Sequence, residues 1–373
     1  MAHNERSGGE VPEVERAQVV IPCRDLAPTL EFFTESLGMV VDTIFPADSP
    51  QVAVVSGHGI TLRLEQGASG DPGSLRLEVG GEPGEFTERE IHAPNGTRVR
   101  LVPADVPVLV PEGVQELVVT RLADADWGVG RAGMRYRDLI PGRLGGRFVA
   151  SHISIPDGGP VPDYVHYHHI RFQMIYCYRG WVKVAYEDQG DPFVLQAGDC
   201  VLQPPRIRHR VMEASPGLEV VEIGCPAVHD THADHLMDLP TGRFLPDRDY
   251  GGQRFVRHVA ASARWRPWRH SGFEYRDIGI GAATDGLAGV RVARPAGARA
   301  TDPVRHDGEF MFGFVLEGST ILRIENREDE ILATGDSFVI PAGPEYSLEN
   351  CSPDLQILDV TLPASPPVRA GAR

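Results

Sequence analysis

The last two thirds of the chain contain an internal repeat. Four sets of residues return 137 to 139 positions later: Tyr136-Arg137-Asp138 as Tyr275-Arg276-Asp277, Gly180 as Gly318, Gly198-Asp199 as Gly335-Asp336, and Pro204 as Pro341. Four matches at nearly the same offset in sequence are not expected by chance. We therefore expect residues 109–238 and 239–373 to be two copies of one domain.

Both copies are predicted to consist of β-strands. Their apolar runs are short and are separated by Gly, Pro and Asp at close intervals, with little amphipathic helical pattern. This pattern is typical of a β-sandwich or β-barrel. The predicted fold class is mainly β, with two tandem domains of sandwich or barrel type.

Three histidines of the first copy form a candidate metal site. His166 and His168 stand at i and i+2, so both imidazoles leave the same face of a β-strand, and His169 points to the other face. His209 follows a Gly-Asp turn, an apolar run and Pro204-Pro205, which predicts a second strand that brings in a third imidazole. Three imidazoles can hold a divalent metal and leave coordination positions for water, dioxygen or substrate.

The spacing of these residues resembles both signature motifs of the cupin family. The first motif is carried by His166, His168, Gln173 and Gly180, and the second by Gly198, Pro204 and His209. The resemblance implies a bicupin, that is, two tandem double-stranded β-helix barrels. The family usually has a carboxylate ligand at the position of Gln173. That amide therefore either coordinates weakly, orients a bound water or peroxide, or has no new task.

The second copy departs from the motif. Aligned by its glycines, it has Val304 and Tyr346 at two of the histidine positions, keeps only His306, and has Met311 at the carboxylate position. One imidazole does not hold a catalytic metal, and Glu309 is poorly spaced from His306. We expect this barrel, residues 239–373, to be metal-free and to pack against its twin.

Residues 15–108 are predicted to form a separate α+β domain. The order of a strand at residues 17–23, a helix closed by Gly38 and two further strand runs resembles one βαβββ module of the vicinal oxygen chelate (glyoxalase-like) family. Ile91–Pro103 resembles the closing hairpin of a second, shortened module. The resemblance implies metal ligands at Gln18 and Glu65. We interpret the domain as a structural or dimerising remnant, with a functional metal site as the alternative.

The composition excludes several classes of partner. A net charge of −16 argues against nucleic acid or an anionic membrane, and no segment reaches the ~18 apolar residues of a membrane span. The polar residues 1–14 are predicted to be a disordered tail without a signal core. Five scattered cysteines suit reduced thiols in a cytoplasmic protein.

The charge balance of the site predicts an anionic substrate. Three neutral imidazoles and a neutral amide leave the charge of a divalent metal uncompensated, and such a centre favours an enolate, carboxylate or catecholate. Arg171, with Arg206 and Arg208 as alternatives, is the candidate anchor for the negative group. Glu213 shares the strand face of His209 and is a candidate to line the pocket.

The leading functional prediction is a non-haem dioxygenase that acts on a small anionic organic molecule. Fe(II) is the preferred metal, with Mn, Ni or Zn as alternatives. Its predicted catalytic residues are Gln173, Arg171 and Glu213, around a metal on His166, His168 and His209. Two alternatives remain: a metal-dependent isomerase, lyase or decarboxylase, and a bicupin that binds a small molecule without catalysis. A homo-oligomer is compatible with each.

Overall fold

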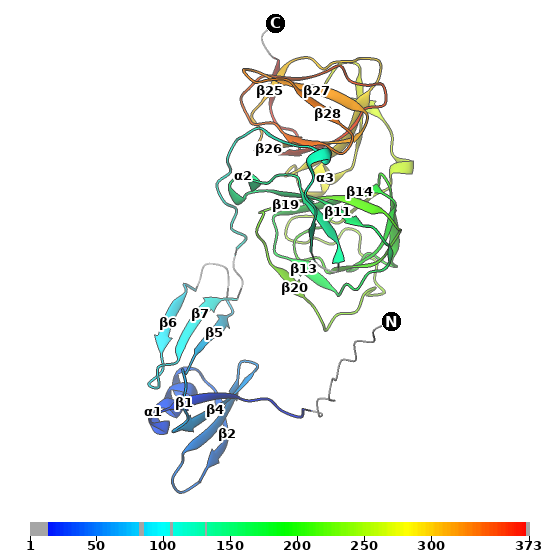
Figure 1. Ribbon diagram of the computed structural model, residues 1–373. Coiled ribbons are helices and arrows are strands. Elements are labelled where there is room, and N and C mark those ends of the chain that lie inside the picture. The colour runs from blue at the N-terminus through cyan, green and yellow to red at the C-terminus, as the bar shows by residue number, and fades with distance from the viewer. Residues whose placement is uncertain (1–13, 82–85, 105–106, 131–132, 371–373) are drawn as a thin grey trace, which may run out of the picture. The chain divides into compact units, whose positions relative to one another are not determined.

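The computed structural model describes residues 14–81, 86–104, 107–130 and 133–370 (Figure 1). The predicted disordered tail lies outside the described residues, apart from Val14. The chain divides into two compact units between Pro107 and Val108. Within the described ranges, no helix has both the length and the apolar character to cross a membrane.

The N-terminal unit has two small sheets. The first contains β1 (Val19–Cys23), β2 (Val40–Phe45), β3 (Val52–Gly57) and β4 (Ile60–Gln66) in the order β1-β4-β3-β2. Between β1 and β2 lie α1 (Leu26–Glu31), capped by Asp25, and its π-helical continuation η1 (Phe32–Ser36). The second sheet has the order β5-β7-β6, made of β5 (Ser74–Val79), β6 (Arg89–His92) and β7 (Arg98–Pro103).

This element order matches the predicted βαβββ unit and closing hairpin, but the two predicted ligand positions do not converge. Strands β1 and β4 run parallel with Pro22 opposite Glu65. Gln18 precedes β1, four residues before Pro22, which corresponds to about 13 Å along a strand. Glu65 instead accepts a hydrogen bond of 2.8 Å from Nε of Arg63. Gln18 and Glu65 therefore do not form a ligand pair, and the likeness to the vicinal oxygen chelate family stays a prediction.

The first barrel consists of two curved sheets. One has the order β21 (Val256–His258), β17 (Cys200–Leu202), β14 (Phe172–Arg179), β19 (Leu218–Cys225), β11 (Val149–Ile155), β10 (Arg135–Asp138), β9 (Gly128–Val129). The other has the order β16 (Phe193–Gln196), β15 (Trp181–Tyr186), β18 (His209–Ala214), β13 (His166–His168), β20 (Thr231–Ala233), and β12 (Gly159–Pro160) also pairs with β18. The short helix α2 (Arg143–Gly146) precedes β11.

The second barrel repeats this architecture. Its first sheet has the order β22 (Arg266–Pro267), β23 (Phe273–Asp277), β24 (Gly289–Pro295), β31 (Gln356–Leu362), β26 (Phe310–Glu317), β29 (Ser337–Val339), β8 (Val118–Thr120). The other has the order β28 (Glu330–Ala333), β27 (Ser319–Ile324), β30 (Tyr346–Glu349), β25 (Val304–His306), β32 (Val368–Ala370). Short helical turns occur at η2 (Leu122–Asp124), η4 (Ala260–Ser262) and α3 (Ile280–Ala283).

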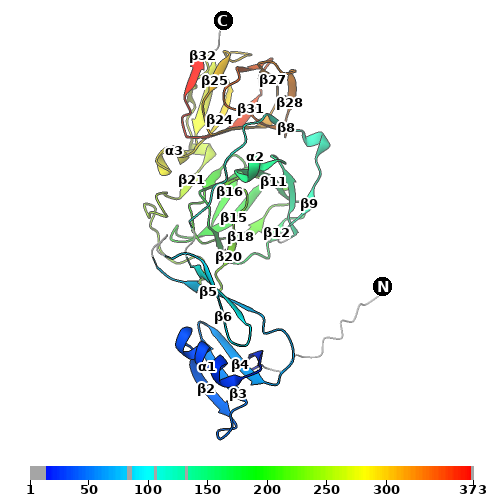
Figure 2. The same ribbon diagram turned by 90° about the vertical axis from the view of Figure 1, so that its left-hand side faces the viewer.

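The two barrels exchange strands. β8 precedes the first barrel in sequence but pairs with β29 of the second, and β21 precedes the second barrel but pairs with β17 of the first. Figure 2 shows β8 against the second barrel and β21 against the first. A cut of the chain between residues 238 and 239, the predicted boundary, would separate β21 from the sheet to which it is hydrogen-bonded.

A shared hydrophobic core joins the barrels because side chains alternate along their central strands. On β14, Phe172, Met174 and Tyr176 are buried in this core. From the second barrel, Phe310 of β26 stacks on Phe148, with ring centroids 4.0 Å apart. Tyr178, two residues after Tyr176, also belongs to the shared core.

The repeated Tyr-Arg-Asp motif forms reciprocal contacts between the barrels. Nη2 of Arg137 donates to the carbonyl oxygen of Gly335 at 2.7 Å, and Nη2 of Arg276 donates to that of Gly198 at 3.3 Å. Each arginine thus binds the repeat-equivalent glycine of the other barrel. An interface of this kind is self-complementary, as in a twofold dimer.

We predict that Arg137→Met lowers the free energy of unfolding by about 1–3 kcal/mol, because it leaves the Gly335 carbonyl group buried without its donor. Urea unfolding followed by circular dichroism measures the change. Arg135→Met is the matched control, since Arg135 is exposed on the same strand, and should stay within about 0.5 kcal/mol of the wild type. Equal destabilisation by both substitutions would contradict a specific role of Arg137.

Candidate metal centre

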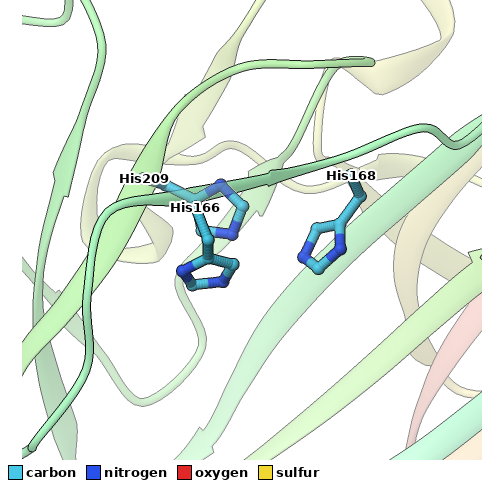
Figure 3. A group of neighbouring side chains, drawn as sticks. All are labelled: His166, His168 and His209. Atoms are coloured by element: carbon cyan, nitrogen blue, oxygen red, sulfur yellow. The ribbon is translucent and has the colours of Figure 1, made fainter. Parts of the chain in front are cut away.

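The three predicted histidines converge in the first barrel. His166 and His168 lie on β13, and the adjacent antiparallel strand β18 places His209 directly opposite His166. All three are buried, and their ligand atoms lie within 4.8 Å of one another. Figure 3 shows the three rings gathered in one space. Among the described residues, this is the one group of three or more His, Cys, Asp or Glu that could hold a metal ion.

Backbone carbonyl groups orient the three rings. Nδ1 of His166 lies 2.8 Å from the carbonyl oxygen of Tyr164, and Nδ1 of His209 lies 3.0 Å from that of Ile207. Nδ1 of His168 lies 3.4 Å from the carbonyl oxygen of Asp230. A carbonyl oxygen only accepts, so Nδ1 of His166 and of His209 carries the proton and their Nε2 atoms keep their lone pairs. Nδ1 of His168 also contacts the hydroxyl group of Thr231 at 3.2 Å, which can donate or accept. Metal-binding histidines are typically oriented in this way.

This donor set fits a divalent transition metal. Imidazole nitrogen is a ligand for Fe, Mn, Ni, Cu and Zn, and three such ligands leave positions open for further molecules. The Nε2 atoms of His166, His168 and His209 would hold the ion. A bound divalent cation would supply Lewis acidity there, by drawing electron density from the oxygen atoms of an anionic chelator.

The histidines line one end of a cavity of about 350 Å³ inside the barrel. Gln173 also lines it, as does Ile175, and Cys177 is buried in the adjoining apolar cluster. These three residues alternate along β14 with the residues of the shared core. The two-residue periodicity of the strand therefore directs all three to the same side of β14.

The cavity contains a carboxylate that sequence reasoning missed. Glu222 of β19 lines the cavity, and its Oε1 accepts a hydrogen bond of 2.6 Å from Nε2 of Gln173. The position follows from the pairing of β14 with β19, which places Glu222 opposite Ile175. No sequence motif marks this position. The negative charge corrects our charge balance, since a divalent cation here would have a net charge of +1 together with Glu222.

A second polar pair flanks the histidines. Nε2 of Gln203 donates to the hydroxyl group of Tyr186 at 3.1 Å, and the Tyr186 ring stacks on His209. Burial raises the pKa of Tyr186, so its hydroxyl group stays protonated. Oε1 of Gln203 is buried without a hydrogen-bond partner among the described residues. Because buried polar atoms normally have partners, this oxygen suits a donor on water or ligand.

The structure does not place the predicted arginine anchor in the cavity. Nη1 and Nη2 of Arg171 donate to the Glu309 carboxylate of the second barrel, with Nη1 2.7 Å from Oε1. Arg208 binds Asp234 with its Nε at 3.1 Å. Neither these two residues nor Arg206 borders the cavity, whereas Arg143 and Arg210 do. The prediction that Arg171 anchors the substrate is corrected, because its guanidinium group forms an ion pair with Glu309, 138 positions later in the sequence.

Glu213 is also outside the cavity. Strand β18 pairs Val211 with Val184 and Glu213 with Lys183, so Met212 is an extra residue that forms a β-bulge. A bulge shifts the alternation of side chains by one position. Val211 lines the cavity, Ala214 is buried, and Glu213 is exposed. The predicted role of Glu213 is corrected for this reason.

The second barrel has no corresponding imidazole cluster among its described residues. Val304 lies opposite Tyr346, as His166 lies opposite His209. His306 has both ring nitrogens engaged by backbone groups, Nε2 with the oxygen of Ile340 at 3.1 Å and Nδ1 with the N–H of Gly308 at 3.1 Å. Its lone pair is thus already used, and we propose that this barrel holds no metal.

A buried ion network fills part of the second barrel. Asp359 lies opposite Gly313 of β26, as Glu222 lies opposite Ile175. Arg291 contacts Asp359 at 2.9 Å and Arg269 at 3.2 Å. Burial alone would raise the pKa of Asp359, but the two guanidinium groups hold it below its usual range. In the first barrel, Ser151 stands opposite Glu222 where the second barrel has Arg291 opposite Asp359.

Comparisons with known proteins agree with this architecture. The model of the Cupin domain family matches residues 290–361, which belong to the second barrel. No curated protein is detectably similar to the chain. The family model thus matches the second barrel, whereas the histidine motifs lie in the first. The two barrels therefore support the same fold through different features of the sequence.

Solved structures of oxalate decarboxylases are similar in fold. A point variant of the Bacillus subtilis enzyme superposes with a TM-score of 0.51 at 12% identity, covering 72% of this chain and 82% of that chain. The Lactobacillus farciminis enzyme in complex with formate gives a TM-score of 0.50 at 14% identity, covering 71% and 91%. A further B. subtilis structure, described by its Mn(II) centres, gives 0.50 at 12% identity, covering 72% and 82%. With identities this low, the superpositions show similarity of fold alone, which is mainly β with two tandem cupin barrels.

We predict that His209→Ala removes most bound metal, because one of three ligands is lost. The loss of affinity should exceed the roughly 10- to 100-fold that follows removal of a supporting hydrogen bond. Elemental analysis after gel filtration measures the stoichiometry. Tyr346→Phe is the matched control at the equivalent position of the second barrel and should bind as much metal as the wild type. Unchanged metal content in His209→Ala would contradict the site.

A pH-dependent stability term is predicted for His270 of the second barrel. Burial, reinforced by Arg269, lowers its pKa to about 4, and its Nε2 accepts from Nε of Arg269 at 3.3 Å. Below about pH 6.5 the unfolded chain takes up a proton that the folded chain does not. Stability from this group is therefore complete above pH 6.5 and falls by up to about 3 kcal/mol as the pH decreases towards 4. The unfolding free energy of the wild type, measured relative to that of His270→Gln, should decrease from pH 7 to pH 6 and further to pH 5. Parallel profiles of the two proteins would contradict this assignment.

Proposed function

We propose that the first barrel is the active site of a metal-dependent enzyme that performs acid–base chemistry on a small organic anion, as a decarboxylase, lyase or isomerase. The observation that carries the proposal is the presence of Glu222 in the same cavity as the three oriented imidazoles. A general acid or base must reach the reacting atom, and a carboxylate inside the cavity meets this requirement.

The environment of Glu222 distinguishes a reactive carboxylate from a structural one. No cation pairs with it among the described residues, and Gln173 holds it through one hydrogen bond. Its counterpart Asp359 is neutralised by Arg269 and Arg291. Since the two residues occupy equivalent strand positions, the comparison supports a proton-transfer role in the first barrel alone.

The residues of the cavity have different roles in the proposed reaction. The Nε2 atoms of His166, His168 and His209 would hold the cation that binds the anionic group. Gln173 positions the Glu222 carboxylate, which takes a proton from the substrate or returns one to it. The three histidines and Gln173 are buried, so the charges of the site act in a medium less polar than water.

The choice of metal remains part of the proposal. We propose Fe(II) or Mn(II) for this chain. Imidazole ligation suits Fe(II), and Mn(II) is described for a structurally similar oxalate decarboxylase. The second candidate function is the dioxygenase. It is supported by the ligand group itself, which among the described residues consists of three imidazoles and leaves coordination positions for dioxygen and substrate. Metal analysis of protein purified without oxygen, followed by oxygen-uptake assays, distinguishes the two.

We predict that Glu222→Gln lowers kcat by about 10²- to 10⁴-fold, because it removes the proton-transfer group and keeps its size. Turnover of a panel of carboxylic acids, followed by NMR, measures the effect, and metal stoichiometry should not change. Glu213→Gln, exposed outside the cavity, is the control and should retain activity. Full activity of Glu222→Gln on a substrate that the wild type turns over without oxygen would refute the proposed role.

A further inference from the structure

The cavity has a polar end and an apolar end, and strand register gives their order. His166, Gln173, Tyr186 and His209 form the polar end. Two residues further along the strands lie Ile175 opposite Glu222, and Val184 opposite Val211. Each step of two residues along a strand is about 7 Å. The backbone of Glu222 is therefore one layer below that of Gln173, and its carboxylate reaches back to Gln173 through the hydrogen bond of 2.6 Å.

A third layer is apolar. Cys177 lies opposite Val220, Val220 lies opposite Ile153, and Val182 lies opposite Leu195. All but the cysteine line the cavity, which continues past Glu222 to this layer. Val182, Leu195 and Cys177 belong to one hydrophobic cluster. This layer, defined here as the apolar lobe, lies about 13 Å from the Gln173 level.

From this order we infer that the substrate of the proposed enzyme is an amphiphilic anion. Its carboxylate or enolate would lie at the histidines, its reacting carbon beside Glu222, and a hydrocarbon substituent of several carbons in the apolar lobe. A two-carbon dianion such as oxalate has no apolar surface to cover this lobe. It would leave the lobe as water-filled space against hydrocarbon walls. The inference rests on the proposed function for the position of the anionic group, whereas the apolar lobe is formed by the chain itself.

The size of the cavity agrees with this class of ligand. A volume of about 350 Å³ lies within the range of small-molecule sites, which are mostly apolar with a few placed polar groups. Burying one methylene group contributes about 0.8 kcal/mol, equivalent to about fourfold in affinity. Each carbon of a linear chain that enters the apolar lobe should therefore strengthen binding by about that factor until the lobe is full.

A chain-length series tests the inference. Acetate, butanoate, hexanoate and oxalate are titrated into the Mn²⁺-loaded full-length protein by calorimetry. We expect hexanoate to bind up to roughly two orders of magnitude more tightly than acetate, and oxalate to bind more weakly than hexanoate. Affinity that does not change with chain length, or tightest binding of oxalate, would overturn the inference.

Variants that fill the apolar lobe provide a second test. Val220→Phe, and independently Val182→Phe from the opposite sheet, should abolish the advantage of hexanoate over acetate and keep the metal stoichiometry. Val194→Phe, on β16 but outside the cavity lining, is the matched control and should keep the advantage. If both filled variants retain metal and still prefer hexanoate as the wild type does, the apolar lobe is not where the hydrocarbon binds.

The same experiments separate this inference from the proposed function. If the wild type binds no Mn²⁺ or Fe²⁺, the proposed function fails, and the chain-length series on metal-free protein still tests the apolar lobe. If metal binds and the series is flat, the substrate class alone is wrong.

Discussion

The alternation of side chains along β14 is the constraint on which the rest of the first barrel depends. One set of residues on this strand, including Gln173 and Ile175, faces the cavity, and the other set, including Phe172 and Met174, enters the core shared with the second barrel. A strand in this position has no face directed to solvent. Polar residues are therefore confined to the cavity side, where a ligand can use them, and packing against the twin barrel holds the cavity wall in register.

The two barrels show how one framework supports two different interiors. In the second barrel, Asp359 is locked between two guanidinium groups, and Phe338 occupies the space that a side chain at Gly313 would need, with its ring 2.2 Å from an ideal Cβ. In the first barrel, Ile175 takes the position of Gly313, and Ser151 takes that of Arg291. Because Ser151 is small and neutral where the second barrel has Arg291, the carboxylate of Glu222 receives no guanidinium partner from this position. A buried ion network fixes a structure, whereas a single carboxylate in a cavity can exchange protons.

Sequence spacing was sufficient for the histidines because the determining contacts are local to two adjacent strands. The i, i+2 spacing of His166 and His168 needs only strand periodicity, and the pairing of His209 follows from the second motif. The errors arose where distant or irregular structure intervenes. Arg171 is bound by Glu309 of the other barrel, and the bulge at Met212 turns Glu213 outward. Glu222 has no motif and becomes visible only when the register of β14 with β19 is known.

The exchange of β8 and β21 has a consequence for the history of the chain. Each copy completes the sheet of the other and donates an arginine to the equivalent glycine, so the two copies have the relation of subunits in a domain-swapped homodimer. This relation is what gene fusion of an ancestral two-chain assembly would leave behind. Covalent linkage raises the effective concentration of one copy around the other. Once association no longer depended on two identical halves, one half could lose its ligands while still acting as the permanent partner of the other.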